Sequence, residues 1–202
     1  MTNVAFSLRV PPSWQEIDLA PRTRDGSARD FVMRRLAEQP ALYPHRTDLT
    51  RNVRNLARRA HDSGALYLAV FAESAHESIV PGSVTVTLLP HAPGSHGRDD
   101  PLEAVVEQLR EIPQPDGDGE WRSLTSVEVT GHGHAARTYG VEEVEIDGGV
   151  VVWNVLMRTF VPVPSGVLLV MCASPALDLA DPLLELFSVV SDTLEITRQD
   201  AA

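Results

Sequence analysis

Two apolar segments late in the chain constrain its fold more than any other feature. They are Val150–Val163 and Val167–Ser174, separated by the turn sequence Pro164-Ser165-Gly166. The first segment is largely apolar at both its odd and its even positions, and the second has no polar side. A strand with two apolar faces has to be covered on both sides. We therefore expect a central hairpin, with Trp153 and Leu169 inside, in a sheet that is screened from water on both faces.

Length and composition are those of an ordinary folded protein. The chain has 202 residues, of which 43% are hydrophobic and 22% charged, which is enough for one domain with a full core, and we expect one domain over residues 1–202. No apolar run approaches the ~20 residues of a membrane-spanning helix, and the N-terminus lacks an export signal. The single cysteine, Cys172, has no disulfide partner within the chain. We expect a cytoplasmic protein without a membrane partner.

Charge is unevenly divided along the sequence. All 17 basic residues are arginine, which together with the abundant alanine, glycine and proline indicates a GC-rich bacterial genome. Residues 1–61 carry 11 arginines and 6 carboxylates, whereas the remainder carries 6 arginines and 22 carboxylates. The net charge of −11 therefore combines a basic N-terminal part with an acidic remainder.

Hydrophobic periodicity and turn residues predict the order of the elements. In the first half we expect a strand at 4–10, an irregular covering segment at 13–26, a helix at 27–39 that begins at a Ser27/Asp30 capping box, a helix capped by Asp48 or Thr50 that ends at Gly64, and strands at 65–71 and 82–89. In the second half we expect a loop at 90–99, a helix from Asp100 to about Ile112, an acidic loop at 115–120, strands at 123–130, 135–146, 150–163 and 167–174, a hairpin turn at 147–149, and a helix at 178–193.

The last four predicted strands follow one another with short connections. Parallel neighbours need a long crossover, so these strands cannot be parallel. The predicted fold class is α+β, with a mostly antiparallel sheet of six or seven strands flanked by helices in an α/β/α sandwich.

This order resembles a known family. The residues that carry the resemblance are Pro11-Pro12-Ser13-Trp14 after the first strand, Val161 to Gly166, Ala173-Ser174-Pro175, and Leu186-Phe187 in the last helix. The pattern looks like the Mog/PsbP-like α/β/α sandwich family, which includes a plant photosystem II extrinsic protein, a nuclear-import accessory factor and many bacterial proteins. Its members mostly bind other proteins. The resemblance therefore implies this fold and a non-enzymatic binding role, without assigning contact residues.

Histidines and carboxylates near residue 140 suggest one possible site. His132 and His134 lie in a predicted turn, and Glu142, Glu143 and Glu145 lie on the strand after it. Such residues are typical zinc ligands, but no third ligand stands at a diagnostic spacing. We assign no metal site and keep a His/Glu metal-dependent hydrolase as one alternative function.

Other catalytic patterns are absent from the sequence. It contains no Gly-x-Ser-x-Gly nucleophile elbow, and apolar neighbours of Cys172 are expected to keep that thiol inert. The glycine-rich segments lack the Lys and Ser/Thr of a phosphate loop. We therefore assign no catalytic residue and no cofactor.

A stripe of arginines on the second predicted helix is the most specific surface feature. Arg51, Arg54 and Arg58 lie opposite the apolar side formed by Leu49, Val53, Leu56, Ala57 and Ala60. The stripe is a solvated helix face, a docking site for an acidic protein surface, or a phosphate contact. The acidic net charge and the lack of interleaved aromatic residues argue against nucleic acid.

The leading functional hypothesis is a cytoplasmic protein-binding or adaptor module without catalytic activity. By analogy it serves a bacterial secretion or toxin system as an accessory factor. The main alternative is a small-molecule or lipid-binding domain, which predicts a cavity of roughly 300 Å³ or more beside the central strands. The sequence leaves the oligomeric state open.

Overall fold

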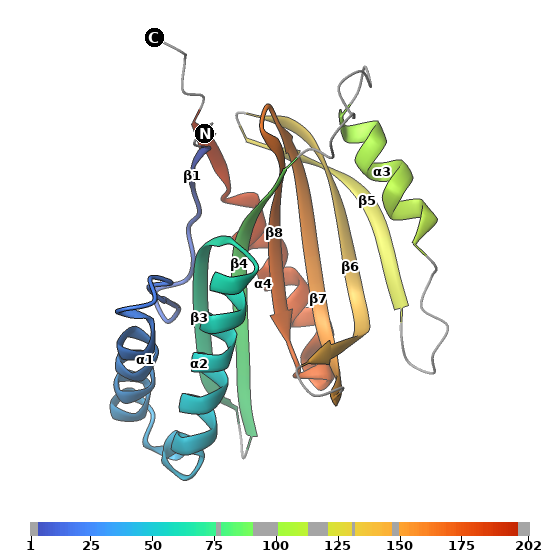
Figure 1. Ribbon diagram of the computed structural model, residues 1–202. Helices are drawn as coiled ribbons and strands as arrows, with labels where there is room; N and C mark the ends of the chain where they lie inside the picture. The colour runs from blue at the N-terminus through green and yellow to red at the C-terminus, as the bar shows by residue number, and fades with distance from the viewer. Residues whose placement is uncertain are drawn as a thin grey trace. The chain divides into compact units, whose positions relative to one another are not determined.

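The computed structural model describes residues 4–75, 78–90, 101–112, 121–130, 132–146 and 150–197. Within these ranges the chain forms a seven-stranded, mostly antiparallel sheet and a separate two-stranded sheet (Figure 1). The sheet is flanked by helices, so the predicted α+β fold class is confirmed.

The chain divides into two compact units. One is Pro11–Thr87, and the other combines Met1–Val10 with Leu88–Ala202. The prediction of a single domain over residues 1–202 stays a prediction.

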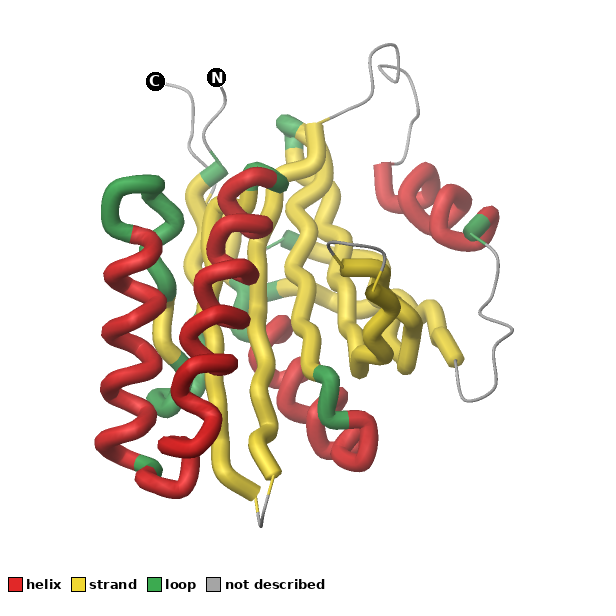
Figure 2. The backbone as a smooth tube through the Cα atoms, turned by 60° about the horizontal axis from the view of Figure 1, so that its bottom comes forward, coloured by secondary structure: helices red, strands yellow, loops and turns green. Residues whose placement is uncertain are grey.

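The unit Pro11–Thr87 consists of a helical hairpin and three strands. Its elements are β2 (Gln15–Glu16), α1 (Arg24–Glu38), the 3₁₀ helix η1 (Pro40–His45), α2 (Arg46–Asp62), β3 (Ala65–Ala75) and β4 (Ser78–Pro90), which continues past the boundary of the unit. The strands pair antiparallel in the order β2-β3-β4. Helices α1 and α2 lie side by side, and α2 packs against β3 (Figure 2).

The core of this unit joins the apolar sides of both helices to β3. The buried residues include Phe31, Val32 and Leu36 of α1, Leu49, Val53, Ala57 and Ala60 of α2, and Leu68, Val70 and Ala72 of β3. Leu56 packs against this cluster and is only partly buried. The apolar side predicted for the second helix is therefore confirmed.

Arg35 is a charged residue inside the apolar side of α1. Its side chain is 7% exposed and donates to Glu38 at 2.6 Å, to Glu73 at 2.8 Å and to the carbonyl of Ala72 at 3.0 Å. Two carboxylates and a carbonyl thus compensate the burial of this charge.

Both helices of the hairpin begin earlier than predicted. Helix α1 begins at Arg24, and Ser27 does not cap it, because its Oγ accepts a hydrogen bond from the backbone N–H of Asp18 at 3.0 Å. Helix α2 begins at Arg46 instead of after Asp48 or Thr50. Asp48 is paired with Arg51, and the Thr50 hydroxyl donates to the carbonyl of Arg46.

The second unit is built on four antiparallel strands. Its elements are β1 (Ala5–Ser7), α3 (Pro101–Glu111), β5 (Trp121–Val129), β6 (Gly133–Ile146), β7 (Val150–Val163), β8 (Gly166–Ser174), the 3₁₀ helix η2 (Leu177–Leu179), α4 (Ala180–Asp192) and β9 (Glu195–Thr197). The order is β8-β7-β6-β5, and β1 pairs separately with β9. The four late strands and both helices match their predictions closely, whereas the strand predicted at 4–10 is only three residues long.

One face of the predicted central hairpin, β7 and β8, is more deeply buried than the other. Along β8 the residues Leu168, Val170 and Cys172 are fully buried, while the alternate positions, Leu169 among them, are half-buried. Trp153 on β7 is also half-buried. Neither Trp153 nor Leu169 is exposed, so both faces of the hairpin are screened from water, one of them only partly.

Helices lie on both faces of these four strands. Arg137 on β6 pairs with Asp192 of α4, so α4 lies on the face that carries the Arg137 side chain. Thr125 on β5 is the cross-strand neighbour of Arg137, so its side chain points to the same face. Arg122 lies three residues from Thr125 on β5, so its side chain points to the opposite face, where its Nη2 donates to the carbonyl of Ile112 just after α3. Within this unit α3 and α4 therefore form the outer layers of an α/β/α arrangement.

Three predicted features lie outside the described residues. They are the loop at 90–99 beyond Pro90, the acidic loop at 115–120 and the hairpin turn at 147–149. The predicted helix cap Asp100 also lies outside them.

Candidate protein-binding site

Arg51, Arg54 and Arg58 lie along one side of α2 and together are called the α2 arginine face. Their spacings of three and four residues place them on neighbouring turns of the helix. Val53 and Ala57, on the other side of α2, are buried in the core. The packing of the apolar side thus fixes the direction in which the arginines point.

Two of the three arginines have a carboxylate partner. Arg51 pairs with Asp48 one turn earlier on α2 at 2.6 Å, and both side chains are largely exposed. Arg58 pairs with Asp25 of α1 at 2.7 Å, and both side chains are about half exposed. Exposed pairs of this kind contribute at most about 1 kcal/mol, so both arginines can exchange partners at little cost.

Arg54 differs from its neighbours on the face. Within the described residues it has no ion pair, and its Nε is buried without a hydrogen-bond acceptor. A buried donor without an acceptor destabilises the folded state, because its hydrogen bond to water is lost on folding and no hydrogen bond within the protein replaces it.

The first turn of α1 adds two residues that sequence reasoning missed. Arg24 and Asp25 lie next to the α2 arginine face, and Arg24 Nε is 3.8 Å from Asp25 Oδ1. The hydrogen bond from Arg58 lowers the pKa of Asp25 below its ordinary value, and the charges of Arg58, Arg24 and Arg54 lower it further. These residues escaped notice because the predicted helix began three residues later, at Ser27.

The two units differ in charge, although less than the two parts of the sequence divided at residue 61. Pro11–Thr87 contains ten arginines and nine carboxylates, whereas the rest of the chain contains seven arginines and nineteen carboxylates. The α2 arginine face therefore belongs to the less acidic unit.

The histidines and glutamates that suggested a hydrolase are not brought together. His132 lies in the turn before β6, and its Nε2 is hydrogen-bonded to the carbonyl of Pro162. His134 lies opposite Glu128 in the strand register. Glu142 is eight residues further along the same strand, about 26 Å away at ~3.3 Å per residue. In the described residues no three His, Cys, Asp or Glu side chains are grouped as metal ligands.

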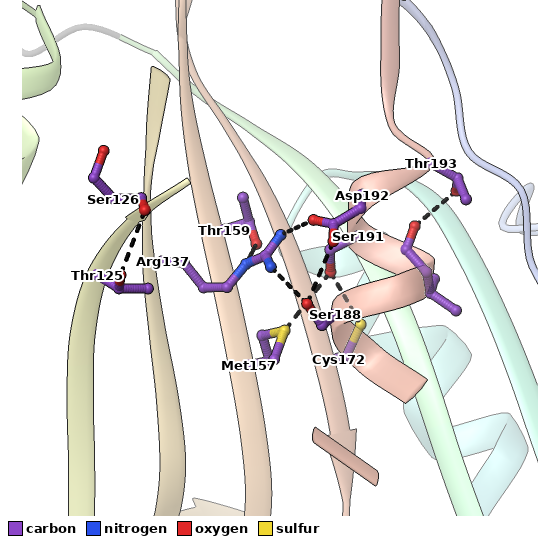
Figure 3. Close-up of polar contacts among 11 residues, drawn as sticks. Thr125, Ser126, Arg137, Met157, Thr159, Cys172, Ser188, Ser191, Asp192 and Thr193 are labelled. Carbon is purple, nitrogen blue, oxygen red and sulfur yellow. Dashed lines mark hydrogen bonds and ion pairs between the residues drawn. The ribbon is translucent and has the colours of Figure 1, made fainter. Parts of the chain in front are cut away.

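A buried polar cluster joins α4 to the sheet (Figure 3). Arg137 donates to Thr159 Oγ1 at 2.9 Å, to Ser188 Oγ at 2.9 Å and to Asp192 Oδ1 at 2.7 Å. Each of the three guanidinium nitrogens of Arg137 thus donates to a different acceptor. Since the arginine is almost fully buried and its partners are satisfied, the cluster is structural.

Cys172 lies beside this cluster and faces Ser191 of α4 (Figure 3). Burial raises the pKa of its thiol from 9.0 to about 12. A thiol that stays protonated at neutral pH is a poor nucleophile. The expectation that Cys172 is chemically inert therefore has a structural basis.

One pocket of about 490 Å³ lies beside β2 and β3. Its lining consists of residues 16–20, Ser27, Leu66 and Tyr67. Glu16, Asp18 and Leu66 are exposed, so the pocket is open to solvent. Its lining includes no residue of β7 or β8, beside which a small-molecule site was expected.

None of the described helices is long and apolar enough to cross a membrane.

Comparison with known proteins identifies no family. No protein-family model matches the chain, and no curated protein matches its sequence. Among solved structures, the crystal structure of LpqN, which is involved in cell envelope biogenesis of Mycobacterium tuberculosis, is 14% identical with a TM-score of 0.48, and the match covers 97% of this chain and 85% of the LpqN chain. Similarity at this level establishes neither family nor function, and the Mog/PsbP-like resemblance stays a prediction.

Proposed function

We propose that the chain is a non-enzymatic protein-binding or adaptor module that docks an acidic surface of another protein on the α2 arginine face. The observation that carries this proposal is the state of Arg54, which is only partly buried and has no ion pair among the described residues, whereas Arg51 and Arg58 are paired. A carboxylate of a partner protein would supply the ion pair that Arg54 lacks. Arginine suits such contacts because its planar guanidinium binds carboxylates in a bidentate manner.

Two observations support a role without catalysis. The only cysteine is fully buried with a raised thiol pKa, and Glu142 lies eight residues along β6 from His134, far from both histidines. Each residue class that suggested nucleophilic or metal-dependent chemistry is thus in a position unsuited to it.

The proposed setting is the bacterial cytoplasm. A single reduced cysteine in the core agrees with a reducing compartment. An accessory role in a secretion or toxin system remains part of the proposal, by analogy with other small acidic bacterial proteins.

The test is affinity capture from the native cell with the immobilised full chain. The wild type is compared with the triple variant Arg51→Glu/Arg54→Glu/Arg58→Glu. A matched control, Arg22→Glu/Arg29→Glu/Arg34→Glu, makes the same charge change at three exposed arginines outside the α2 arginine face. The captured protein is then purified and its affinity measured at increasing salt concentration.

We expect a partner that binds the wild type and the control, is lost with the triple variant, and binds more weakly as salt rises. Capture of the same proteins by all three chains would contradict the proposal. So would binding that is unaffected by salt.

A further inference from the structure

Strand β5 (Trp121–Val129) ends the strand order β8-β7-β6-β5. Among the described residues β6 is the only strand that pairs with it, so one long side of β5 is unpaired. Alternate residues of such an edge strand direct their backbone N–H and C=O groups away from the sheet. Helix α3 packs mainly on β6 and β7. Within the described part of the chain, the outer side of β5 is therefore available to a further strand.

Strand β5 lacks the features that usually keep an edge strand from pairing. Protected edges are short, or carry proline, lysine or a bulge. Strand β5 has nine residues, contains neither proline nor lysine, and pairs with β6 in an unbroken register. By contrast β2, at the end of the order β2-β3-β4, has only two residues. The backbone of β5 thus presents a long and regular pairing surface.

The sequence of β5 is complementary to itself when two copies pair antiparallel along their full length. In that register Thr125 faces Thr125 of the second copy on a two-fold axis. The other facing pairs are Trp121 with Val129, Arg122 with Glu128, Ser123 with Val127, and Leu124 with Ser126. Aromatic residues opposite β-branched residues, threonine opposite threonine, and opposite charges are favourable cross-strand pairs. No two like charges face each other in this register.

Charge on β5 favours this pairing without dominating it. Arg122 and Glu128 leave the strand without net charge, although the whole chain has a net charge of −11. Glu128 is exposed, whereas the Arg122 side chain is only 10% exposed and lies 3.9 Å from Glu142. Arg122 therefore attracts Glu128 of the second copy through its field and not through a direct ion pair. The larger contribution is that of the backbone, because nine facing pairs form about eight to ten hydrogen bonds.

We propose that β5 is an interaction surface for a second copy of this chain, and that the two strands pair antiparallel about Thr125 so that two sheets join across a two-fold axis. This inference goes beyond the proposed function and does not depend on it, because β5 and the α2 arginine face belong to different units. A dimer carries the α2 arginine face twice, which strengthens binding to a partner that has repeated acidic sites.

The test is sedimentation equilibrium of the full chain at concentrations up to about 1 mM, where even a weak dimer is populated. Physiological ionic strength screens the repulsion between two acidic chains. The variants Thr125→Lys and Thr125→Glu each place like charges opposite each other on the two-fold axis, whereas an equal mixture of the two places opposite charges there. Thr125 is exposed, so the single chain tolerates either side chain. The matched control is Thr130→Lys, at an exposed threonine in the turn after β5.

We expect the apparent mass of the wild type to rise with concentration toward twice that of one chain. Each Thr125 variant alone should dimerise about fivefold to tenfold more weakly, because like charges directly opposite each other destabilise a strand pair. The equal mixture should recover most of this loss, and Thr130→Lys should dimerise within about twofold of the wild type. Circular dichroism checks that each variant is folded.

Three results would overturn the inference. A wild type that stays monomeric up to about 1 mM would show that β5 does not pair with itself, which leaves its edge to a strand of another protein. Equal dimerisation of the wild type and both Thr125 variants would place the contact on another surface. Dimerisation of the mixture that is as weak as that of each variant alone would exclude a register with Thr125 on the axis.

Discussion

Arg137 on β6 and Asp192 at the end of α4 form an ion pair with a distance of 2.7 Å between Nη2 and Oδ1. The arginine side chain is 5% exposed, whereas the aspartate is 53% exposed. The buried guanidinium therefore depends on this carboxylate as an acceptor, whereas the carboxylate can also be hydrated by solvent. It fastens the last turn of α4 to the sheet.

Asp192→Ala is expected to lower the free energy of unfolding by about 2–3 kcal/mol, because it leaves a buried guanidinium nitrogen without its acceptor. Arg137→Met is expected to cost less, since the remaining carboxylate can be hydrated and the methionine fills much of the space. Urea unfolding of the three proteins measures both changes.

A matched control for this prediction is the pair Arg9–Glu195, in which the atoms are 3.3 Å apart and both side chains are largely exposed. Glu195→Ala is expected to change stability by less than about 0.5 kcal/mol. If Asp192→Ala costs no more than Glu195→Ala, the burial of Arg137 does not strengthen its pairing.

The strands and the apolar helix sides were predictable because they depend on local patterns of apolar and turn residues. The continuous apolar run of β7 and the spacing of Leu49, Val53 and Ala57 on α2 are local patterns that burial imposes on any sequence of this type. The mostly antiparallel sheet followed from the short connections between the late strands. These features do not depend on which distant residues meet.

The candidate site was only partly predictable, because it depends on contacts between residues that are distant in the sequence. The spacing of Arg51, Arg54 and Arg58 could be recognised on one helix, but Arg24 and Asp25 join them only through the packing of α1 on α2. The capping box at Ser27 misled the prediction because that hydroxyl serves the backbone of Asp18 instead. Local helix signals cannot distinguish these uses of one side chain.

Phe187→Ala is expected to destabilise the protein by about 3–5 kcal/mol, because Phe187 on α4 is fully buried and the change leaves a cavity. Trp153→Ala is expected to cost about half as much, because the half-buried indole loses less contact area than its size suggests. Val189→Ala, on the exposed side of α4, serves as the control and should lie within about 0.5 kcal/mol of the wild type.

The measurement is urea unfolding followed by circular dichroism, with the denaturant slope compared among the four proteins. A larger loss for Trp153→Ala than for Phe187→Ala would mean that the hairpin, and not α4, holds the main core of its unit.

Gly64→Ala is expected to destabilise the protein by about 1–2 kcal/mol. Gly64 follows α2 with a φ of 75°, and a Cβ at this position would meet no atom within 4 Å. The cost would therefore come from the left-handed backbone alone. Thermal unfolding measures the shift.

Gly26→Ala provides the opposite case. Gly26 lies within α1, and a Cβ would again meet no atom within 4 Å. Alanine is the better helix former there and should stabilise the protein by about 0.5–1 kcal/mol. Equal effects of the two substitutions would contradict the assigned backbone conformations.

Cys172→Ala is expected to change how stability depends on pH above about pH 9. Burial raises the pKa of this thiol from 9.0 to about 12, so the folded protein keeps a proton that the unfolded chain releases in that interval. Unfolding then releases a proton, and the free energy of unfolding falls by about 1.4 kcal/mol per pH unit as pH rises. Below about pH 9 the stabilisation from this group is fully present.

The Cys172→Ala variant has no thiol to ionise at this position, so its free energy of unfolding should fall less steeply as the pH rises. The difference between wild type and variant is expected to shift by about 2 kcal/mol between about pH 9 and pH 10.5. The raised pKa of Tyr67, about 12, is common to both proteins and cancels in the difference. Urea unfolding at a series of pH values gives both curves. Parallel curves would mean that the Cys172 thiol ionises as readily in the folded protein as in the unfolded chain, and hence that α4 does not seal it from water.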